Sequence, residues 1–207
     1  SSKVSMYTNA RPIIVQNNLI NPGSNGMFHV LGVKSGNLIF SDILSASSRE
    51  IKYFDNNDII SNPVFKDPYF YITSHSGNMS AYHLSSFKNK WSIPIGSKNT
   101  PIISGKTVFN IDNTGLLYAI DRENGFVRWK TKFQTEIKTG FFFEEKKFIN
   151  FIGPYIISDK VVLINDNQTM FLINPDNGKV VSKISLNGKV SSGIFLTNQI
   201  IFLFSNG

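Results

Sequence analysis

The side chains of this chain that could do acid–base or metal chemistry are three histidines and fourteen carboxylates, because it contains no cysteine. The absence of cysteine excludes disulfides, thiolate metal sites and cysteine nucleophiles. The histidines His29, His75 and His83 show none of the spacings typical of metal ligands. The segment 55–58 resembles the start of a calcium loop, but its twelfth position is Lys66, where that loop needs glutamate. We therefore predict no catalytic residue, no metal site and no cofactor.

Three of the aspartates, Asp112, Asp121 and Asp166, stand where apolar runs end. Aspartate is common at such places because its carboxylate hydrogen-bonds to the backbone of its own turn. The simplest interpretation of these acids is therefore structural, and the elements that position them decide what else they can do.

Those elements belong to a repeat. Four copies each begin at a proline, reach a first turn residue fourteen positions later and a second turn about ten positions after the first. The second turn falls at Gly36, Gly125 and Gly178, and in the loosened second copy at Lys88 or Asn89. Fourteen positions after the first turn stand Phe40, Trp91, Trp129 and Ser182. The copies begin near residues 12, 63, 101, 154 and 193.

Within a copy the apolar residues alternate as they do in strands, and Asn-Gly pairs supply tight turns. The pattern of each copy predicts an antiparallel sheet of about four short strands. Such sheets can bury both faces by stacking around a common axis. The sequence thus predicts an all-β propeller that occupies residues 1–207, with four to five blades of a larger ring. Segments 41–62 and 130–153 are insertions. The alternative is a β-sandwich with coincidental spacing.

The third copy, LLYAIDRENGFVRW, closely resembles the blade motif of quinoprotein-type (PQQ-like) propellers, A-x-D-x-x-x-G-x-x-x-W. Ala119, Asp121, Gly125 and Trp129 fill this motif, and Trp91 holds its tryptophan position in the second copy. We interpret all five as structural residues. The aspartate and glycine shape a turn, and the indole fills the gap between adjacent blades.

Among these families, the order of the copies is most similar to BamB, the outer-membrane assembly lipoproteins, whose propellers have eight blades. The resemblance implies a non-enzymatic scaffold at the periplasmic side of the outer membrane, either peripheral or held by a lipid anchor that is not in this chain. The implied partners are the barrel-assembling outer-membrane subunit and unfolded outer-membrane proteins. Because the last copy stops in mid-blade, we expect an incomplete propeller.

The same resemblance implies that loops between the strands of a blade bind the partner. Asp112 and Asn113 match the acidic loops of that family, and Arg122 and Glu123 lie on the next turn. Phe142 and Phe143, in an aromatic cluster, are candidate anchors for a partner. The alternative is that this cluster is a strand buried between blades and that the residues after it, Glu-Glu-Lys-Lys, form its turn.

The net charge of +7 raises the question of a nucleic-acid partner. The lysines are spread along the chain and form a single doublet, at 146–147, so we predict that nucleic acid is not bound. Two other functions stay open: a fragment of a PQQ-dependent dehydrogenase, and a propeller domain of a receptor that senses a ligand or peptide. The dehydrogenases often carry a vicinal disulfide, which this chain cannot form.

Overall fold

The computed structural model describes residues 10–44, 57–133, 136–139, 145–187, 190–197 and 200–205. Strands dominate these residues, and their one helix is a short 3-10 turn, η1 (Ser24–Gly26). In this part of the chain no helix has the length and apolar character needed to cross a membrane. The predicted all-β class is confirmed.

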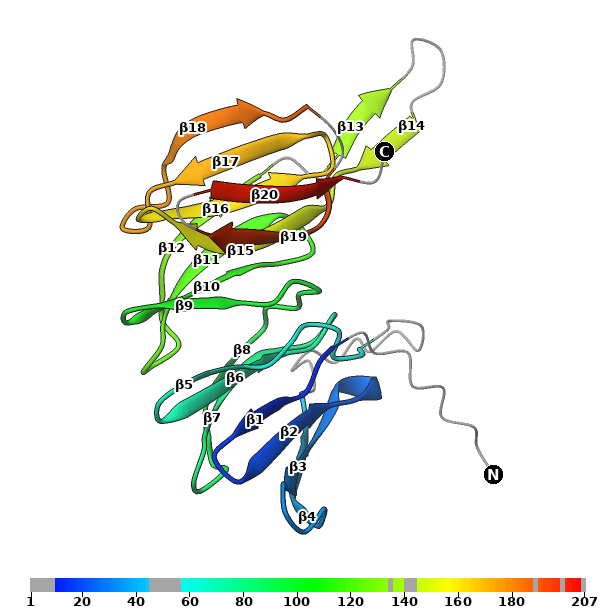
Figure 1. The fold of residues 1–207 in the computed structure, drawn as a ribbon, viewed down its shortest axis with the longest axis vertical. Helices are drawn as coiled ribbons and strands as arrows, with labels where there is room; N and C mark the ends of the chain where they lie inside the picture. The colour runs from blue at the N-terminus through cyan, green and yellow to red at the C-terminus, as the bar shows by residue number, and fades with distance from the viewer. Residues whose placement is uncertain are drawn as a thin grey trace.

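Four four-stranded antiparallel sheets follow one another along the chain, and in each the strands pair in sequence order (Figure 1). The first sheet consists of β1 (Ile13–Val15), β2 (Asn18–Pro22), β3 (Met27–Gly32) and β4 (Leu38–Ile43). The second consists of β5 (Val64–Lys66), β6 (Tyr69–Thr73), β7 (Met79–His83) and β8 (Asn89–Ile93). The third consists of β9 (Ile102–Ser104), β10 (Thr107–Ile111), β11 (Leu116–Asp121) and β12 (Val127–Lys132). The fourth consists of β15 (Phe151–Ile157), β16 (Lys160–Asn165), β17 (Thr169–Ile173) and β18 (Val180–Ser185).

Two hairpins accompany these sheets. Strands β13 (Glu136–Thr139) and β14 (Glu145–Phe148) pair within the insertion 130–153 and project from the stack of sheets (Figure 1). Strands β19 (Val190–Thr197) and β20 (Ile200–Ser205) pair beside the fourth sheet. Of the other insertion, 41–62, residues 45–56 lie outside the described residues.

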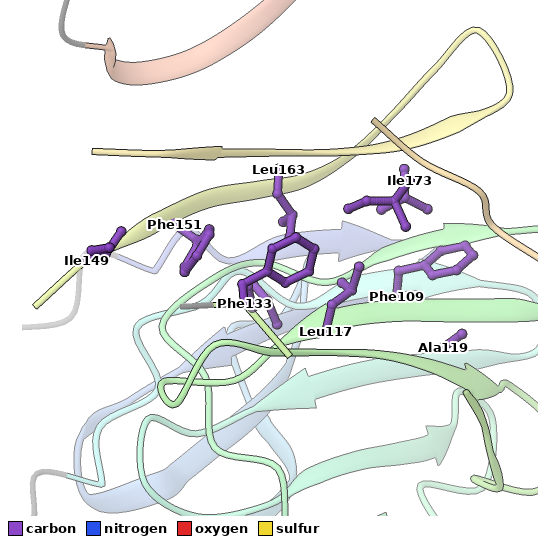
Figure 2. Close-up of a cluster of buried hydrophobic side chains, with 10 residues drawn as sticks. Phe109, Leu117, Ala119, Phe133, Ile149, Phe151, Leu163 and Ile173 are labelled. Atoms are coloured by element: carbon purple, nitrogen blue, oxygen red, sulfur yellow. The ribbon is translucent and has the colours of Figure 1, made fainter. Parts of the chain in front are cut away.

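The sheets stack face to face because the central strands of the second and third sheets direct apolar side chains toward both neighbouring sheets. On β10, Val108 packs against the second sheet, whereas Phe109 and Ile111 pack against the fourth. Figure 2 shows the second of these layers, where Phe109 and Leu117 meet Leu163 and other residues across the seam between two sheets. A sheet with two buried faces is the unit of a propeller, so the predicted architecture is confirmed.

The first strand of each sheet shows how proline affects the pairing. The first three sheets begin directly after Pro12, Pro63 and Pro101. The fourth begins at Phe151 and contains Pro154, and its pairing with β16 shifts at that point. Proline has no N–H to donate to a ladder of hydrogen bonds, so it belongs at the start of a strand or at a bulge.

The turn between the third and fourth strands has one geometry in all four sheets. A residue with positive φ donates its N–H to the carbonyl four residues earlier, at 2.8 to 2.9 Å. The donors are Gly36, Phe87, Gly125 and Gly178. The prediction of Lys88 or Asn89 for the second sheet is therefore wrong. Phe87 takes this place with φ of 54°, and its ring stacks on Phe40 of the first sheet.

The turns gather at two ends of the stack. We call one end the hairpin rim, formed by the turns that join the first to the second and the third to the fourth strand of each sheet. The other end is the connection rim, formed by the turns between second and third strands and by the links between sheets. The six residues of β11 separate the two rims of the third sheet by about 20 Å.

Candidate binding surface

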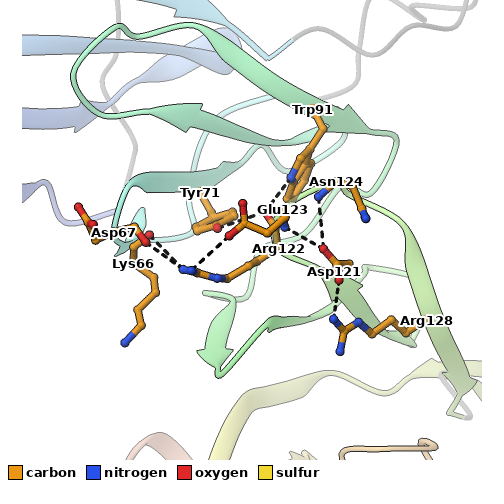
Figure 3. Close-up of polar contacts among 9 residues, drawn as sticks. All are labelled: Lys66, Asp67, Tyr71, Trp91, Asp121, Arg122, Glu123, Asn124 and Arg128. Carbon is orange, nitrogen blue, oxygen red and sulfur yellow. Dashed lines mark hydrogen bonds and ion pairs between the residues drawn. The ribbon is translucent and has the colours of Figure 1, made fainter.

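At the hairpin rim, hydrogen bonds join each of two sheets to the next sheet in the stack. The indole N–H of Trp91, on β8, donates to the carbonyl of Arg122 in the next sheet at 3.0 Å, and the hydroxyl of Tyr71 donates to the same oxygen at 3.3 Å (Figure 3). One seam further, the indole N–H of Trp129 donates to the carbonyl of Pro175 at 2.8 Å. Arg122 and Pro175 hold the same position in their turns, so the two tryptophans have equivalent surroundings.

Glycine in these turns makes room for the indoles. A Cβ added to Gly125 would lie 2.9 Å from Cγ of Trp91, and one added to Gly178 would lie 2.5 Å from Cε3 of Trp129. Both glycines also have positive φ. Ala119 lies directly opposite Trp129 in the β11–β12 pairing and is fully buried. The alanine, the glycines and the tryptophans of the motif thus form the seams of the propeller.

In the seam between the first and second sheets, two phenyl rings take the place of the indole and glycine. Phe40 stands where the other sheets have tryptophan, and it stacks on Phe87 with ring centres 5.5 Å apart and planes 15° from parallel. Because a phenyl ring is smaller than an indole, the next turn has space for a side chain instead of a glycine. This contact explains why Phe87 accepts a positive φ, which is costly for a bulky residue.

Polar groups fix the turn between β11 and β12 (Figure 3). Arg122 donates to the carbonyl of Asp67 in the second sheet at 3.1 Å and pairs with Glu123 at 3.2 Å. Asp121 pairs with Arg128 and accepts the backbone N–H of Glu123. The hydrogen bond from Arg128, with smaller contributions from backbone N–H groups, holds the pKa of Asp121 below its ordinary value.

Asp112 and Asn113 lie on the connection rim. The Oδ1 atom of Asp112 accepts the N–H groups of Thr114 and Leu116 at 2.8 and 2.9 Å, and Oδ2 accepts the hydroxyl of Tyr118 at 3.2 Å. Burial, with the negative charge of Asp112, raises the pKa of Tyr118 to about 12. The Asn113 amide donates to the carbonyl of His75 in the second sheet at 2.7 Å.

The four predicted loop residues therefore do not form one surface. Asp112 and Asn113 lie at one end of β11, and Arg122 and Glu123 lie at the other. Phe142 and Phe143 lie outside the described residues. Among the residues that the structure does describe, no three histidines or carboxylates gather as a metal site would require.

An exposed aromatic residue on the hairpin rim was not predicted. Phe126 follows the turn glycine of the third sheet, and 73% of its surface is exposed. In the other sheets the corresponding residues are polar: Asn37, Lys88 and Lys179. Comparing the residue after the turn in all copies would have revealed this aromatic departure. Its neighbours Glu123 and Val127 are also exposed.

Four-stranded antiparallel blades, with an aromatic residue on the outer strand of each of the first three packed on the turn of the next blade, define a PQQ-like β-propeller. A family model described as outer membrane protein assembly factor BamB matches residues 1–131, and the chain belongs to this family.

Comparison with curated proteins gives relatives of the same name. The outer membrane protein assembly factor BamB of Moranella endobia is 24% identical over 188 residues, which make up 88% of this chain and 44% of the relative. The protein of that name in Yersinia pestis is 21% identical over 206 residues, or 99% of this chain and 49% of the relative. The chain thus spans about half the length of these curated relatives.

Solved structures agree on the fold. The crystal structure of BamB from Moraxella catarrhalis matches with a TM-score of 0.75 at 16% identity, covering 98% of this chain and 57% of that one. Quinohemoprotein alcohol dehydrogenase from Comamonas testosteroni matches with a TM-score of 0.61 at 11% identity, covering 95% of this chain and 38% of that one. At such identities these similarities show the fold alone.

Proposed function

We propose that this chain forms part of a non-enzymatic scaffold that binds protein partners during outer-membrane protein assembly. The family match over residues 1–131 carries the proposal, because the family is described as an outer membrane protein assembly factor. The proposed location is the periplasmic side of the outer membrane, with lipid-anchored or peripheral attachment. The proposed partners are the barrel-assembling subunit and unfolded outer-membrane proteins.

We assign the partner contact to the hairpin rim of the third sheet. On the connection rim, the carboxylate of Asp112 and the amide of Asn113 are engaged in hydrogen bonds that hold the turns together. At the hairpin rim, the exposed ring of Phe126 lies beside the exposed Glu123 and Val127. Aromatic residues are enriched among the hot spots of protein interfaces, and polar residues are common at the rim.

The test is binding of the purified protein to the purified barrel-assembling subunit. Phe126→Ser should weaken binding about tenfold or more, as truncation of an aromatic hot spot does. It should leave the thermal midpoint unchanged, because the ring is largely exposed. Lys179→Ser, at the corresponding position of the fourth sheet, is the matched control and should bind like the parent.

Two results would contradict the proposal. If the parent protein binds no outer-membrane assembly component, the scaffold function is wrong. If Phe126→Ser binds as tightly as the parent does, the scaffold function stands and the assigned rim is wrong.

A further inference from the structure

A groove of about 390 Å³ opens on the connection rim between the third and fourth sheets. Lys132 and Lys183 supply positive charge to it, and Asn165 and Thr169 supply polar groups. Phe133 and Ile149, which Figure 2 shows in the adjacent core, belong to its apolar lining together with Phe171 and Val180. None of the lining residues that the structure describes carries a carboxylate.

The amide of Asn165 has an unused donor in this groove. The residue is only 8% exposed, and its Oδ1 atom accepts the N–H of Thr169 at 2.8 Å. Its Nδ2 has no hydrogen-bond partner within the described part of the chain. The ammonium of Lys183 lies 5.8 Å from the centre of the Phe171 ring, and that of Lys132 donates to the carbonyl of Thr114. Lys132 and Lys183 are exposed, so both have further N–H groups for a ligand.

Comparison with the third sheet shows which charged group this groove lacks. Its Asp112 corresponds to Asn165, because each side chain accepts the backbone N–H four residues later. Its Tyr118 corresponds to Phe171, since the two face Lys130 and Lys183 at the same place in their sheets.

In the third sheet a carboxylate therefore accepts a phenol hydroxyl, at 3.2 Å. In the fourth sheet an amide and a phenyl ring replace both groups, while the lysine stays. The groove retains the lysine of this arrangement and lacks its anion.

We propose that this groove binds a carboxylate of a partner's peptide segment, with an adjacent apolar side chain of that segment against Phe171 and Val180. Lysine ammonium groups and an amide N–H are the donors that a carboxylate accepts, and charge-assisted hydrogen bonds are stronger than neutral ones. The apolar side of the groove favours a peptide over a small inorganic anion. The inference rests on the proposed function only in taking the ligand from a protein partner.

Fluorescence anisotropy with the purified protein tests the proposal. The probes are two labelled peptides with blocked ends, one with Asp-Phe at its centre and its twin with Asn-Phe. The Asp-Phe peptide should bind about fivefold more tightly than its twin at low salt, and the difference should shrink at high salt. Lys183→Gln should remove most of this preference, whereas Lys130→Gln, at the corresponding place in the third sheet, should retain it.

Asn165→Asp supplies the missing carboxylate from within the chain. It should fold, because Asp112 makes the same turn contact in the third sheet, and it should abolish the preference for the acidic peptide. Equal affinities of the two peptides for the parent would overturn the proposal. So would an unchanged preference in Asn165→Asp, or displacement of the peptide by inorganic phosphate at equal concentration. Because the assay contains no assembly subunit, its failure leaves the assignment of Phe126 untouched.

Discussion

Replacing Gly125 by alanine should destabilise the protein more than the same replacement at Gly36. The two glycines hold the same position in their turns and have similar backbone angles, with φ of +76° and +68°. A Cβ at Gly125 would lie 2.9 Å from Cγ of Trp91, whereas a Cβ at Gly36 would meet nothing within 4 Å. Comparing the two variants therefore separates the free-energy cost of a positive φ from the cost of displacing the indole of Trp91.

The magnitude follows from these two contributions. An L-residue in the left-handed region costs about 1 to 2 kcal/mol, and this is all that Gly36→Ala should lose. At Gly125 the indole must also move, and overpacking of a filled site costs a further 1 to 3 kcal/mol or so. We therefore expect Gly125→Ala to lose about 2 to 5 kcal/mol, which is a large part of the stability of a typical domain.

Urea denaturation followed by far-UV circular dichroism measures both losses, provided that the slope m is unchanged. In a Trp91→Phe background, which gives this seam the smaller ring found at Phe40, the difference between the two alanine variants should shrink. Equal losses for Gly125→Ala and Gly36→Ala in the parent protein would refute the role that we assign to the indole.

Three further outcomes follow from contacts in the seams and turns. Phe87→Gly should lower the free energy of unfolding by about 1 to 3 kcal/mol, because the packing of its ring is lost. Phe40→Trp in the same chain should recover part of this loss. A double-mutant cycle measures the recovery, and simple additivity of the two substitutions would contradict the predicted contact. Tyr82→Phe removes a hydroxyl–carboxylate hydrogen bond of 2.8 Å between the first two sheets, and urea titration should show a loss of about 1 kcal/mol. The pKa of Asp121 is lower in the folded state than its ordinary 3.8, so its contribution is complete above that value and is lost as the pH falls through the folded pKa. Asp121→Asn should therefore flatten the loss of stability in acid, and an unchanged pH profile would disprove the contribution of this ion pair.

The blades could be predicted because their signals are local. Alternating apolar residues determine a strand, and proline or glycine at fixed places ends it, so the four copies could be aligned before any packing was known. The tryptophan positions followed from the same spacing. The turn at Phe87 could not be predicted in this way, because no glycine marks it and its conformation depends on the ring of Phe40 in another sheet.

The candidate binding residues were harder to predict for a geometric reason. Asp112 and Arg122 are close in the sequence, yet a strand places them on opposite rims. The exposure of Phe126 depends on how the fourth strand begins, which the alternation of apolar residues does not specify.

By itself, the sequence determined the repeat, the strands, the turn glycines and the aromatic positions, since each depends on interactions between residues near in the chain. Only the tertiary structure decided which aromatic ring meets which turn, which loop residues share a rim, and that Lys132 and Asn165 face one groove. Those relations join different sheets, and they are set by the packing of two faces against each other.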